Sequence, residues 1–235
     1  MILCDIDNVL ATNCGRDTAI GEPIYRTFVQ MPTAFHDIRR ACVPIHVVTA
    51  KAEREARQIL AAIGLSAWVD SVIGANKLLW ATLLDALGRG RAPTKVSKAF
   101  YRRFLSDDGS GPVVMIEDRE SHLEDMLSHE SIDGGVLVPP ILFNGNHVAQ
   151  WFDLNSALLA ALAMVLGTRS VRARPAGMFV ADQRIIRLPP ERPGLGGVPA
   201  VTADQLATGE LLRKARLSPI SVLRQVRKSV LHRLP

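Results

Sequence analysis

The 235-residue sequence has few cysteines, few aromatic residues and no long apolar run. Its three cysteines, Cys4, Cys14 and Cys42, are odd in number and widely spaced, which excludes a CxxC zinc site and argues against a disulfide framework. No apolar stretch approaches the ~20 residues that span a bilayer. The first ten residues carry two acids and no basic residue, so we expect no secretory signal. These absences favour a cytoplasmic protein without a transmembrane segment.

The composition includes 48% hydrophobic residues, enough for a buried core, and the charge is uneven. Residues 1–166 hold 15 Lys/Arg against 19 Asp/Glu, a net −4, whereas residues 167–235 hold 13 against 4, a net +9. This asymmetry is typical either of a basic tail that meets an anionic partner or of a solvated, solubilising tail. Phe179 is the single aromatic residue after residue 166, so any nucleic-acid affinity of the tail would come from phosphate contacts.

Short apolar strands alternate with helical segments through the first 140 residues. Strands are expected at 2–6, 44–49, 68–73, 113–116 and 135–138, and helices at 32–43, 52–63, 77–87, 95–105 and 119–128. This alternation predicts an α/β fold with a parallel sheet of about five strands and helices on both faces. In such sheets, ligands bind beyond the carboxyl ends of the strands.

The character of the sequence changes after the fifth strand. An Ala/Leu-rich helix is expected at 155–166, so we place a first domain at residues 1–166. Residues 167–201 are rich in Gly, Pro and Arg and are expected to form an irregular linker, in which a hairpin over residues 178–188 is one alternative. A capping-box pattern that starts at Thr202 and a second helix start at Ser218 predict a basic helical tail over residues 202–235.

Polar side chains follow three of the expected strands, and a lysine begins the helix before the fourth strand; these residues are Asp5, Asp7, Thr49, Lys95, Glu117 and Asp118. Asp5 and Asp7 stand two residues apart, and such residues share one side of a strand. Carboxylates beside a buried strand need a cation or hydrogen-bond donors. In a parallel sheet all these residues converge on one crevice at the carboxyl edge.

This pattern resembles the phosphatase branch of the haloacid dehalogenase-like (HAD) hydrolase superfamily. The resemblance covers about residues 1–140 and lies in three features: an apolar strand followed by Asp5-Ile6-Asp7-Asn8-Val9-Leu10, a second ending in Thr49, and a third ending in Glu117-Asp118. A lysine is expected about two dozen residues before the last motif. Lys95, 23 residues before Asp118, fits that place, and Lys98 is the alternative.

The sequence departs from the family pattern at two places. Asn8 stands where glycine is usual. The family's second acid after the fourth motif is absent, because His122 and Leu123 occupy those positions. The adjacent pair Glu117 and Asp118 would therefore have to serve instead.

The resemblance implies a Mg²⁺-dependent phosphomonoester hydrolase. Asp5 would be the nucleophile that forms an aspartyl-phosphate, and Asp7 would be the general acid and base. Thr49 and Lys95 would bind the phosphoryl oxygens. The resemblance also implies further substrate-binding residues, Asn8, Ala50 and Arg119, and a set of Mg²⁺ ligands, Asp5, Asp7, Glu117 and Asp118. An acid at Asp7 favours phosphate as the substrate group, because the dehalogenase branch lacks it.

The room for a cap bears on the substrate. Only 34 residues separate Val9 from Pro44, so we expect a HAD-like fold with a small cap or none, plus the helical extension. The expected partner is a phosphorylated small molecule or polymer. In one alternative, a nucleic-acid end phosphatase similar to the polynucleotide kinase–phosphatase type uses residues 202–235 to contact nucleic acid or an acidic partner. In the other, a non-catalytic HAD-fold module binds a cation or a partner. The sequence leaves the oligomeric state open.

Overall fold

The computed structural model describes residues 1–16, 23–26, 31–90, 96–105, 111–140, 142–144, 147–150, 152–167 and 184–189. The predicted tail over residues 202–235 and most of the predicted linker lie outside the described residues, so both stay predictions. No helix in the described ranges is long and apolar enough to cross a membrane.

Six strands form one sheet in the order β10-β7-β6-β1-β4-β5, and every neighbouring pair in it is parallel. The strands are β1 (Ile2–Cys4), β4 (Ile45–Val48), β5 (Ser71–Ile73), β6 (Val114–Glu117), β7 (Gly134–Leu137) and β10 (Ile185–Arg187). The first five match the predicted strands and confirm the parallel α/β class. β10 corrects the predicted number of strands, because it adds a sixth parallel strand from within the segment 167–201 that we expected to be mostly irregular.

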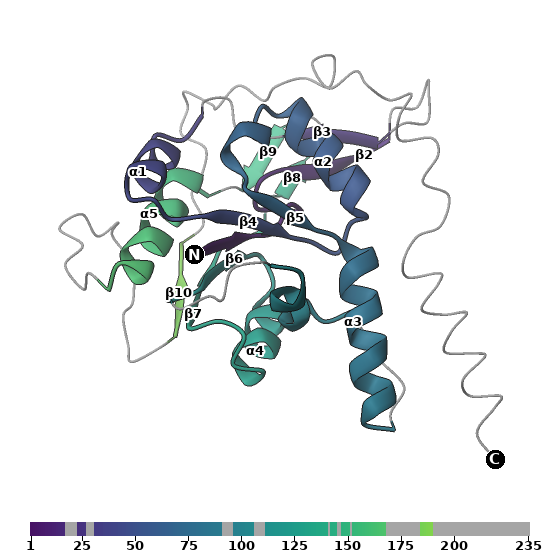
Figure 1. The fold of residues 1–235 in the computed structure, drawn as a ribbon. Helices are drawn as coiled ribbons and strands as arrows, with labels where there is room; N and C mark the ends of the chain where they lie inside the picture. Colours follow the sequence, from purple (N-terminus) through teal and green to yellow (C-terminus); the bar gives the residue numbers. More distant parts are fainter. Residues whose placement is uncertain are drawn as a thin grey trace.

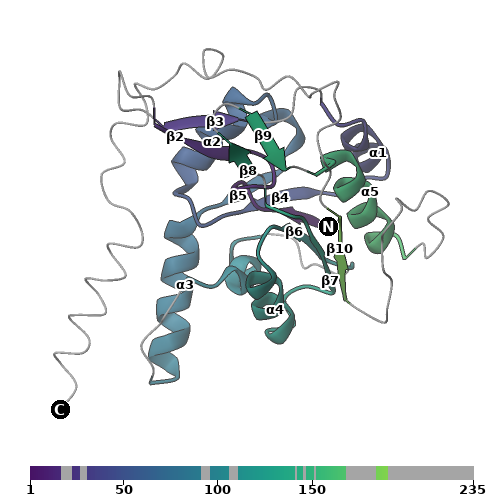
Figure 2. The ribbon, with the colours of Figure 1, turned by 180° about the vertical axis from the view of Figure 1, so that it is seen from behind.

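Helices cover both faces of this sheet (Figures 1 and 2). One face carries α1 (Ala34–Arg40), α2 (Glu53–Ala62) and α5 (Leu154–Val165). The other carries α3 (Ala75–Gly88), α4 (Glu120–Ser128) and the 3₁₀ helix η2 (Lys98–Phe104). A short 3₁₀ turn, η1 (Ser66–Trp68), leads into β5. The helix predicted at 95–105 is therefore a 3₁₀ helix in its described part.

The core is split between the two faces because β1 is buried on both. Ile2 and Cys4 pack with α1, α2 and α5, whereas Leu3 between them packs with α3, η2 and α4. Leu3 pairs with His46 of β4 on one side and Met115 of β6 on the other. β1 is thus the central strand, and the segment that follows it begins in the middle of the carboxyl edge.

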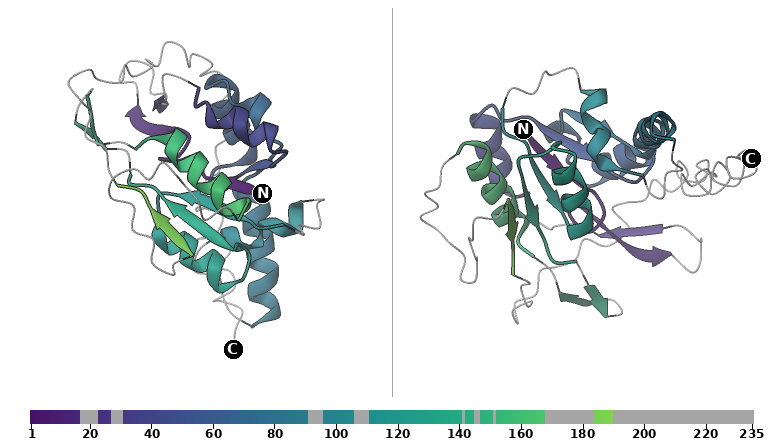
Figure 3. Two further views of the ribbon diagram at one scale, coloured as in Figure 1. Left: turned by 90° about the vertical axis from the view of Figure 1, so that its left-hand side faces the viewer. Right: turned by 90° about the horizontal axis from the view of Figure 1, so that it is seen from below.

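Two β-hairpins lie beyond the carboxyl ends of the strands (Figure 3, right). One is formed by β2 (Thr12–Arg16) and β3 (Pro23–Arg26), which follow β1. The other is formed by β8 (Leu142–Asn144) and β9 (His147–Gln150), which follow β7. The sequence did not predict either hairpin. The described part of the connection between β1 and α1 holds a hairpin and no helix, which agrees with the expected small cap.

Candidate active site

The chain turns sharply directly after β1, and this turn presents Asp5. The backbone N–H of Asp5 donates to the carbonyl of Ile116 at 3.1 Å, which extends the pairing of β1 with β6. The carbonyl of Ile6 then accepts hydrogen bonds from the N–H groups of Val9, Leu10 and Ala11. Ile6, Val9 and Leu10 are buried, so this turn is fixed by packing as well as by hydrogen bonds.

Asn8 occupies the one tight position of this turn. Its φ is 60°, in the left-handed region that glycine favours and that asparagine tolerates best among the other residues. Its Nδ2 donates to Oδ2 of Asp118 at 2.8 Å. The backbone conformation accounts for the glycine usual in the family pattern, and the amide side chain adds a link to β6 that glycine could not make. The predicted substrate-binding role of Asn8 remains a proposal.

A buried lysine joins the ends of β1 and β6. Nζ of Lys98 lies 2.8 Å from Oδ2 of Asp5 and 2.5 Å from Oε2 of Glu117. The three side chains are 7% exposed or less. Oδ1 of Asp5 accepts the N–H of Ile6 at 2.8 Å, so both Asp5 oxygens are held. This arrangement fixes the Asp5 carboxylate at the central point of the carboxyl edge.

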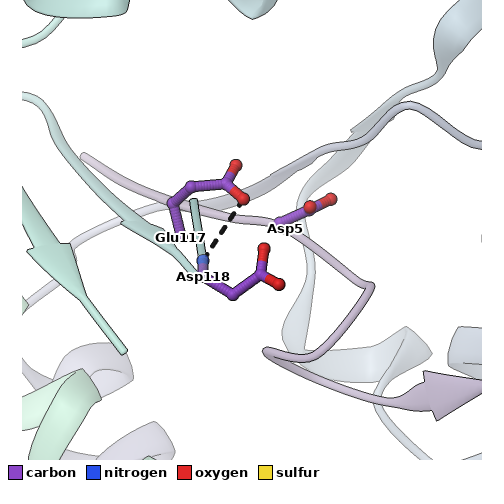
Figure 4. A group of neighbouring side chains, drawn as sticks. All are labelled: Asp5, Glu117 and Asp118. Atoms are coloured by element: carbon purple, nitrogen blue, oxygen red, sulfur yellow. Dashed lines mark hydrogen bonds between the residues drawn. The ribbon is translucent and has the colours of Figure 1, made fainter. Parts of the chain in front are cut away.

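Asp118 completes a cluster of three carboxyl groups (Figure 4). One ligand oxygen of each of Asp5, Glu117 and Asp118 lies within 4.8 Å of the others. The N–H of Asp118 donates to Oε1 of Glu117 at 3.2 Å, the contact that Figure 4 marks with a dashed line. Glu117 is fully buried and Asp118 is half-buried. Glu117 and Asp118 therefore differ in their contacts. Glu117 contacts Lys98, whereas Asp118 accepts a hydrogen bond from Asn8.

Burial is the largest influence on the pKa values of this cluster. Burial raises the pKa of Asp5 to about 6, with Lys98 opposing the shift and Glu117 adding to it. Burial and the neighbouring Glu117 raise the pKa of Asp118 to about 7, with Asn8 opposing. Burial alone would raise the pKa of Glu117, but the Lys98 ammonium, together with His122 and Asp118, outweighs it and holds that pKa below its ordinary value. A cation at the cluster would favour the ionised forms of Asp5 and Asp118.

The donor set fits a hard divalent cation such as Mg²⁺, which takes oxygen ligands. Asp118 is a better candidate to hold it than Glu117, because Asp118 is half-buried whereas Glu117 is fully buried and its Oε2 lies 2.5 Å from the Lys98 ammonium. Asp5 lies beside Asp118 in this cluster and is the second candidate. Asp7, also predicted as a ligand, lies in the same turn as Asp5. Its side chain lies instead against Lys51, with 3.1 Å between Asp7 Oδ1 and Lys51 Nζ.

The loop after β4 lies next to the turn after β1 at the carboxyl edge, because β4 pairs directly with β1. Thr49 is fully buried and extends the sheet through its N–H, which donates to the carbonyl of Ile73 at 3.1 Å. Ala50 follows and is exposed. The N–H of Lys51 donates to Oγ1 of Thr49 at 3.3 Å. Thr49 and Ala50 are thus at the same edge as Asp5, as predicted from the sequence.

Two residues after Asp118 have different surroundings. Arg119, predicted to bind substrate, is exposed at the N-cap of α4, one residue from the carboxyl cluster. Nδ1 of His122 lies 3.3 Å from Oε2 of Glu117 but makes no hydrogen bond in the described structure. His122 therefore contacts the residue that holds Lys98 rather than Asp5.

Of the two lysines that the sequence left as alternatives, the described residues include Lys98. Lys98 begins η2, capped by Ser97, and reaches Asp5. Lys95 lies outside the described residues. Sequence reasoning missed Lys51 altogether, although its place two residues after Thr49, at the carboxyl edge, was a usable signal.

The sequence was compared with protein-family models and with curated proteins, and neither comparison gave a match. A comparison of structures found HAD-superfamily hydrolases and phosphatases. A HAD-superfamily hydrolase from Ehrlichia chaffeensis is 13% identical, with a TM-score of 0.31 over 53% of this chain and 52% of that one. This chain thus spans about half the length of the Ehrlichia protein.

Two 3-deoxy-D-manno-octulosonate 8-phosphate phosphatases are also similar. The one from Moraxella catarrhalis, solved with magnesium, phosphate and the KDO molecule, is 13% identical, with a TM-score of 0.38 over 71% of this chain and 84% of that one. The cobalt-bound one from Haemophilus influenzae is 16% identical, with a TM-score of 0.38 over 71% and 86%. Because each TM-score is below 0.5, we base the functional proposal on the residues of the site.

Proposed function

We propose that this chain is a HAD-type phosphatase, a Mg²⁺-dependent phosphomonoester hydrolase with Asp5 as its nucleophile. The observation that carries the proposal is the Asp5 carboxylate, held by Lys98 and Ile6 next to Asp118 at the carboxyl ends of β1 and β6. A carboxylate with a fixed direction and a neighbouring ammonium group is suited to attack on phosphorus.

The residues of the site divide the reaction between them. An Asp5 oxygen forms a bond to phosphorus while the bond from phosphorus to the leaving oxygen breaks, and Asp7 gives its proton to that oxygen. Water then attacks the phosphorus of the aspartyl-phosphate and passes a proton to Asp7, which releases phosphate and restores the Asp5 carboxylate. The Lys98 ammonium and the Thr49 hydroxyl stabilise the charge on the phosphoryl oxygens.

Mg²⁺ would be held by Asp5 and Asp118, with the Asp7 carbonyl as a further ligand. When bound, it would offset the repulsion between the Asp5 carboxylate and an anionic substrate. Glu117 would keep Lys98 and the Asp118 backbone in place through its two oxygens. Arg119 and Ala50, both exposed beside these groups, would contact the substrate beyond the phosphoryl group.

The test is Mg²⁺-dependent release of phosphate by the full-length protein. A panel of aryl phosphates, sugar phosphates, nucleotides and 3′- or 5′-phosphorylated oligonucleotides covers the small-molecule and polymer classes. We expect turnover by the wild type, loss of at least ~10³-fold in Asp5→Asn, and normal turnover in Asp37→Asn, a matched change on the exposed side of α1. Equal turnover in Asp5→Asn would end the nucleophile assignment.

Metal binding needs a readout separate from turnover. We expect Mg²⁺ to raise the melting temperature of the wild type and of Asp37→Asn, but not that of Asp118→Asn. A wild type that binds Mg²⁺ and hydrolyses nothing on the panel would instead support a non-catalytic cation-binding module. Contact between residues 202–235 and nucleic acid or an acidic partner stays a prediction, which deletion of those residues and the salt dependence of binding would check.

A further inference from the structure

Lys51 connects the loop after β4 with the turn after β1. Its Nζ lies 3.1 Å from Oδ1 of Asp7 and 3.4 Å from Oε1 of Glu55. The Lys51 side chain is 13% exposed, whereas the Asp7 side chain is 39% exposed. A mostly covered ammonium group therefore contacts a carboxylate that reaches into solvent.

The Lys51 backbone is fixed at both its polar groups. Its N–H donates to Oγ1 of Thr49 at 3.3 Å, and its carbonyl accepts the N–H of Ala75 at 2.6 Å. Ala75 begins α3, so Lys51 is bound between the end of β4 and the start of that helix. The ammonium group thus extends from a rigid base toward Asp7.

Asp7 has little else among the described residues to hold its side chain. It lies in a turn, and a partly exposed aspartate samples several rotamers unless a partner selects one. The Lys51 ammonium is that partner. Glu55, on the first turns of α2, approaches the ammonium group from its own helix and helps to keep it in position.

We infer that Lys51 is a positioning residue that sets the direction of the Asp7 carboxyl group for proton transfer to the leaving oxygen. The inference rests on the proposed function, in which Asp7 gives a proton to that oxygen as its bond to phosphorus breaks and takes one from water afterwards. The contribution to stability alone does not account for the pair, because isolated ion pairs near a surface contribute only ~0.2–1 kcal/mol.

The test compares two leaving groups. An alkyl phosphate needs a proton on its leaving oxygen, whereas 2,4-dinitrophenyl phosphate leaves without one. We expect Lys51→Met to lower kcat/KM for the alkyl ester about 10–100-fold, because kcat/KM reports the steps up to departure of the leaving oxygen and misplacing its proton donor is costly. For the dinitrophenyl ester we expect kcat/KM to fall less than about threefold, although kcat can fall for both esters because Asp7 also takes a proton from water in the second step. Lys51→Arg should recover most of the loss.

Matched variants separate this role from a structural one. Lys77→Met removes an ammonium group of α3 that lies 2.9 Å from Glu53 of α2, and it should leave kcat/KM for both esters unchanged. Asp7→Asn should show the same dependence of kcat/KM on the leaving group as Lys51→Met. The double variant of Lys51 and Asp7 should lose no more kcat/KM for the alkyl ester than Asp7→Asn alone. Melting temperatures check that each variant is folded.

The outcomes are distinct. Equal losses of kcat/KM on both esters, or losses that add in the double variant, would overturn the positioning role. Neither result would contradict the proposed phosphatase function. No loss in Lys51→Met would overturn it too. A wild type inactive on every phosphate ester would overturn both this inference and the proposed function.

Discussion

Nδ2 of Asn8 donates a hydrogen bond to Oδ2 of Asp118 at 2.8 Å, and this bond ties the turn after β1 to the end of β6. Asn8 has a φ of 60°, so its backbone and its side chain serve different purposes. The left-handed backbone lets the chain reverse directly after Asp5. The side chain orients one of the carboxyl groups proposed to hold the metal.

Substitutions at Asn8 should separate these two contributions. Asn8→Gly and Asn8→Ala both lose the hydrogen bond, but alanine also has to adopt a φ of 60°. We expect Asn8→Ala to be less stable than Asn8→Gly by about 1 kcal/mol, measured by urea unfolding. Equal stabilities would show that the turn relaxes in the variant and that the left-handed conformation is not required.

Removal of the buried ammonium group should destabilise the fold strongly. Lys98→Met leaves the carboxylates of Asp5 and Glu117 buried without their cation, and breaking such a pair is expected to lower the free energy of unfolding by about 3–5 kcal/mol at pH 7. Lys77→Met, which breaks a partly exposed pair, should lower it by less than about 1 kcal/mol. The comparison is made by urea unfolding, and similar losses in the two variants would contradict the importance of burial.

The stability of the metal-free protein should fall as the pH rises from 5 to 7. Asp5 and Asp118 have folded-state pKa values of about 6 and about 7, raised from 3.8, so between pH 3.8 and 7 the folded state binds more protons than the unfolded chain. Stability therefore decreases with increasing pH in that window. The lowered pKa of Glu117 changes the stability only below about pH 4.5, the ordinary pKa of a glutamate. Asp118→Asn should flatten the profile measured by chemical unfolding, and an unchanged slope would exclude Asp118 as its source.

Gly74 should not tolerate a side chain. A Cβ there would lie 2.3 Å from the backbone nitrogen of Glu53, where α2 begins, so one of the two helices would have to shift. We expect Gly74→Ala to lower stability by about 1–3 kcal/mol. Gly74 precedes α3, and Gly88 is the last residue of that helix. A Cβ at Gly88 would have no atom within 4 Å, so Gly88→Ala should be neutral or stabilising by up to about 1 kcal/mol. Thermal unfolding of the pair checks the expectation.

The sequence predicts the central part of the fold well because each strand there is a short apolar run flanked by a helix with a clear apolar face. It favoured at most a hairpin over residues 178–188 and did not predict β10 as a sixth parallel strand, since Ile185 and Ile186 are two apolar residues within a segment rich in Arg and Pro. That strand exists because β7 offers its edge, which is a tertiary cause. The helix expected from Lys95 proved to be 3₁₀ in its described part, a difference of hydrogen-bond register that side-chain spacing does not encode.

The site was predictable where it depends on strand ends. Asp5, Thr49 and Glu117 follow β1, β4 and β6 or end them, and neighbouring parallel strands bring their carboxyl ends together. The contact between Lys98 and Asp5 was not predictable, because Lys95 and Lys98 both fit the spacing and the start of η2 at Lys98 is not encoded in that spacing. Lys51 was not predicted as a site residue, because the role inferred for it depends on a contact with Asp7 across two loops.

The outermost strand of the sheet has a practical consequence for anyone who shortens this polypeptide. The N–H of Gly135 donates to the carbonyl of Arg184 at 2.7 Å, and the N–H of Leu188 donates to the carbonyl of Leu137 at 2.9 Å. A fragment that stopped after α5 would leave these groups of β7 open to any passing extended peptide, a common origin of aggregation. Recombinant versions should therefore extend beyond residue 189 to stay dispersed at high concentration.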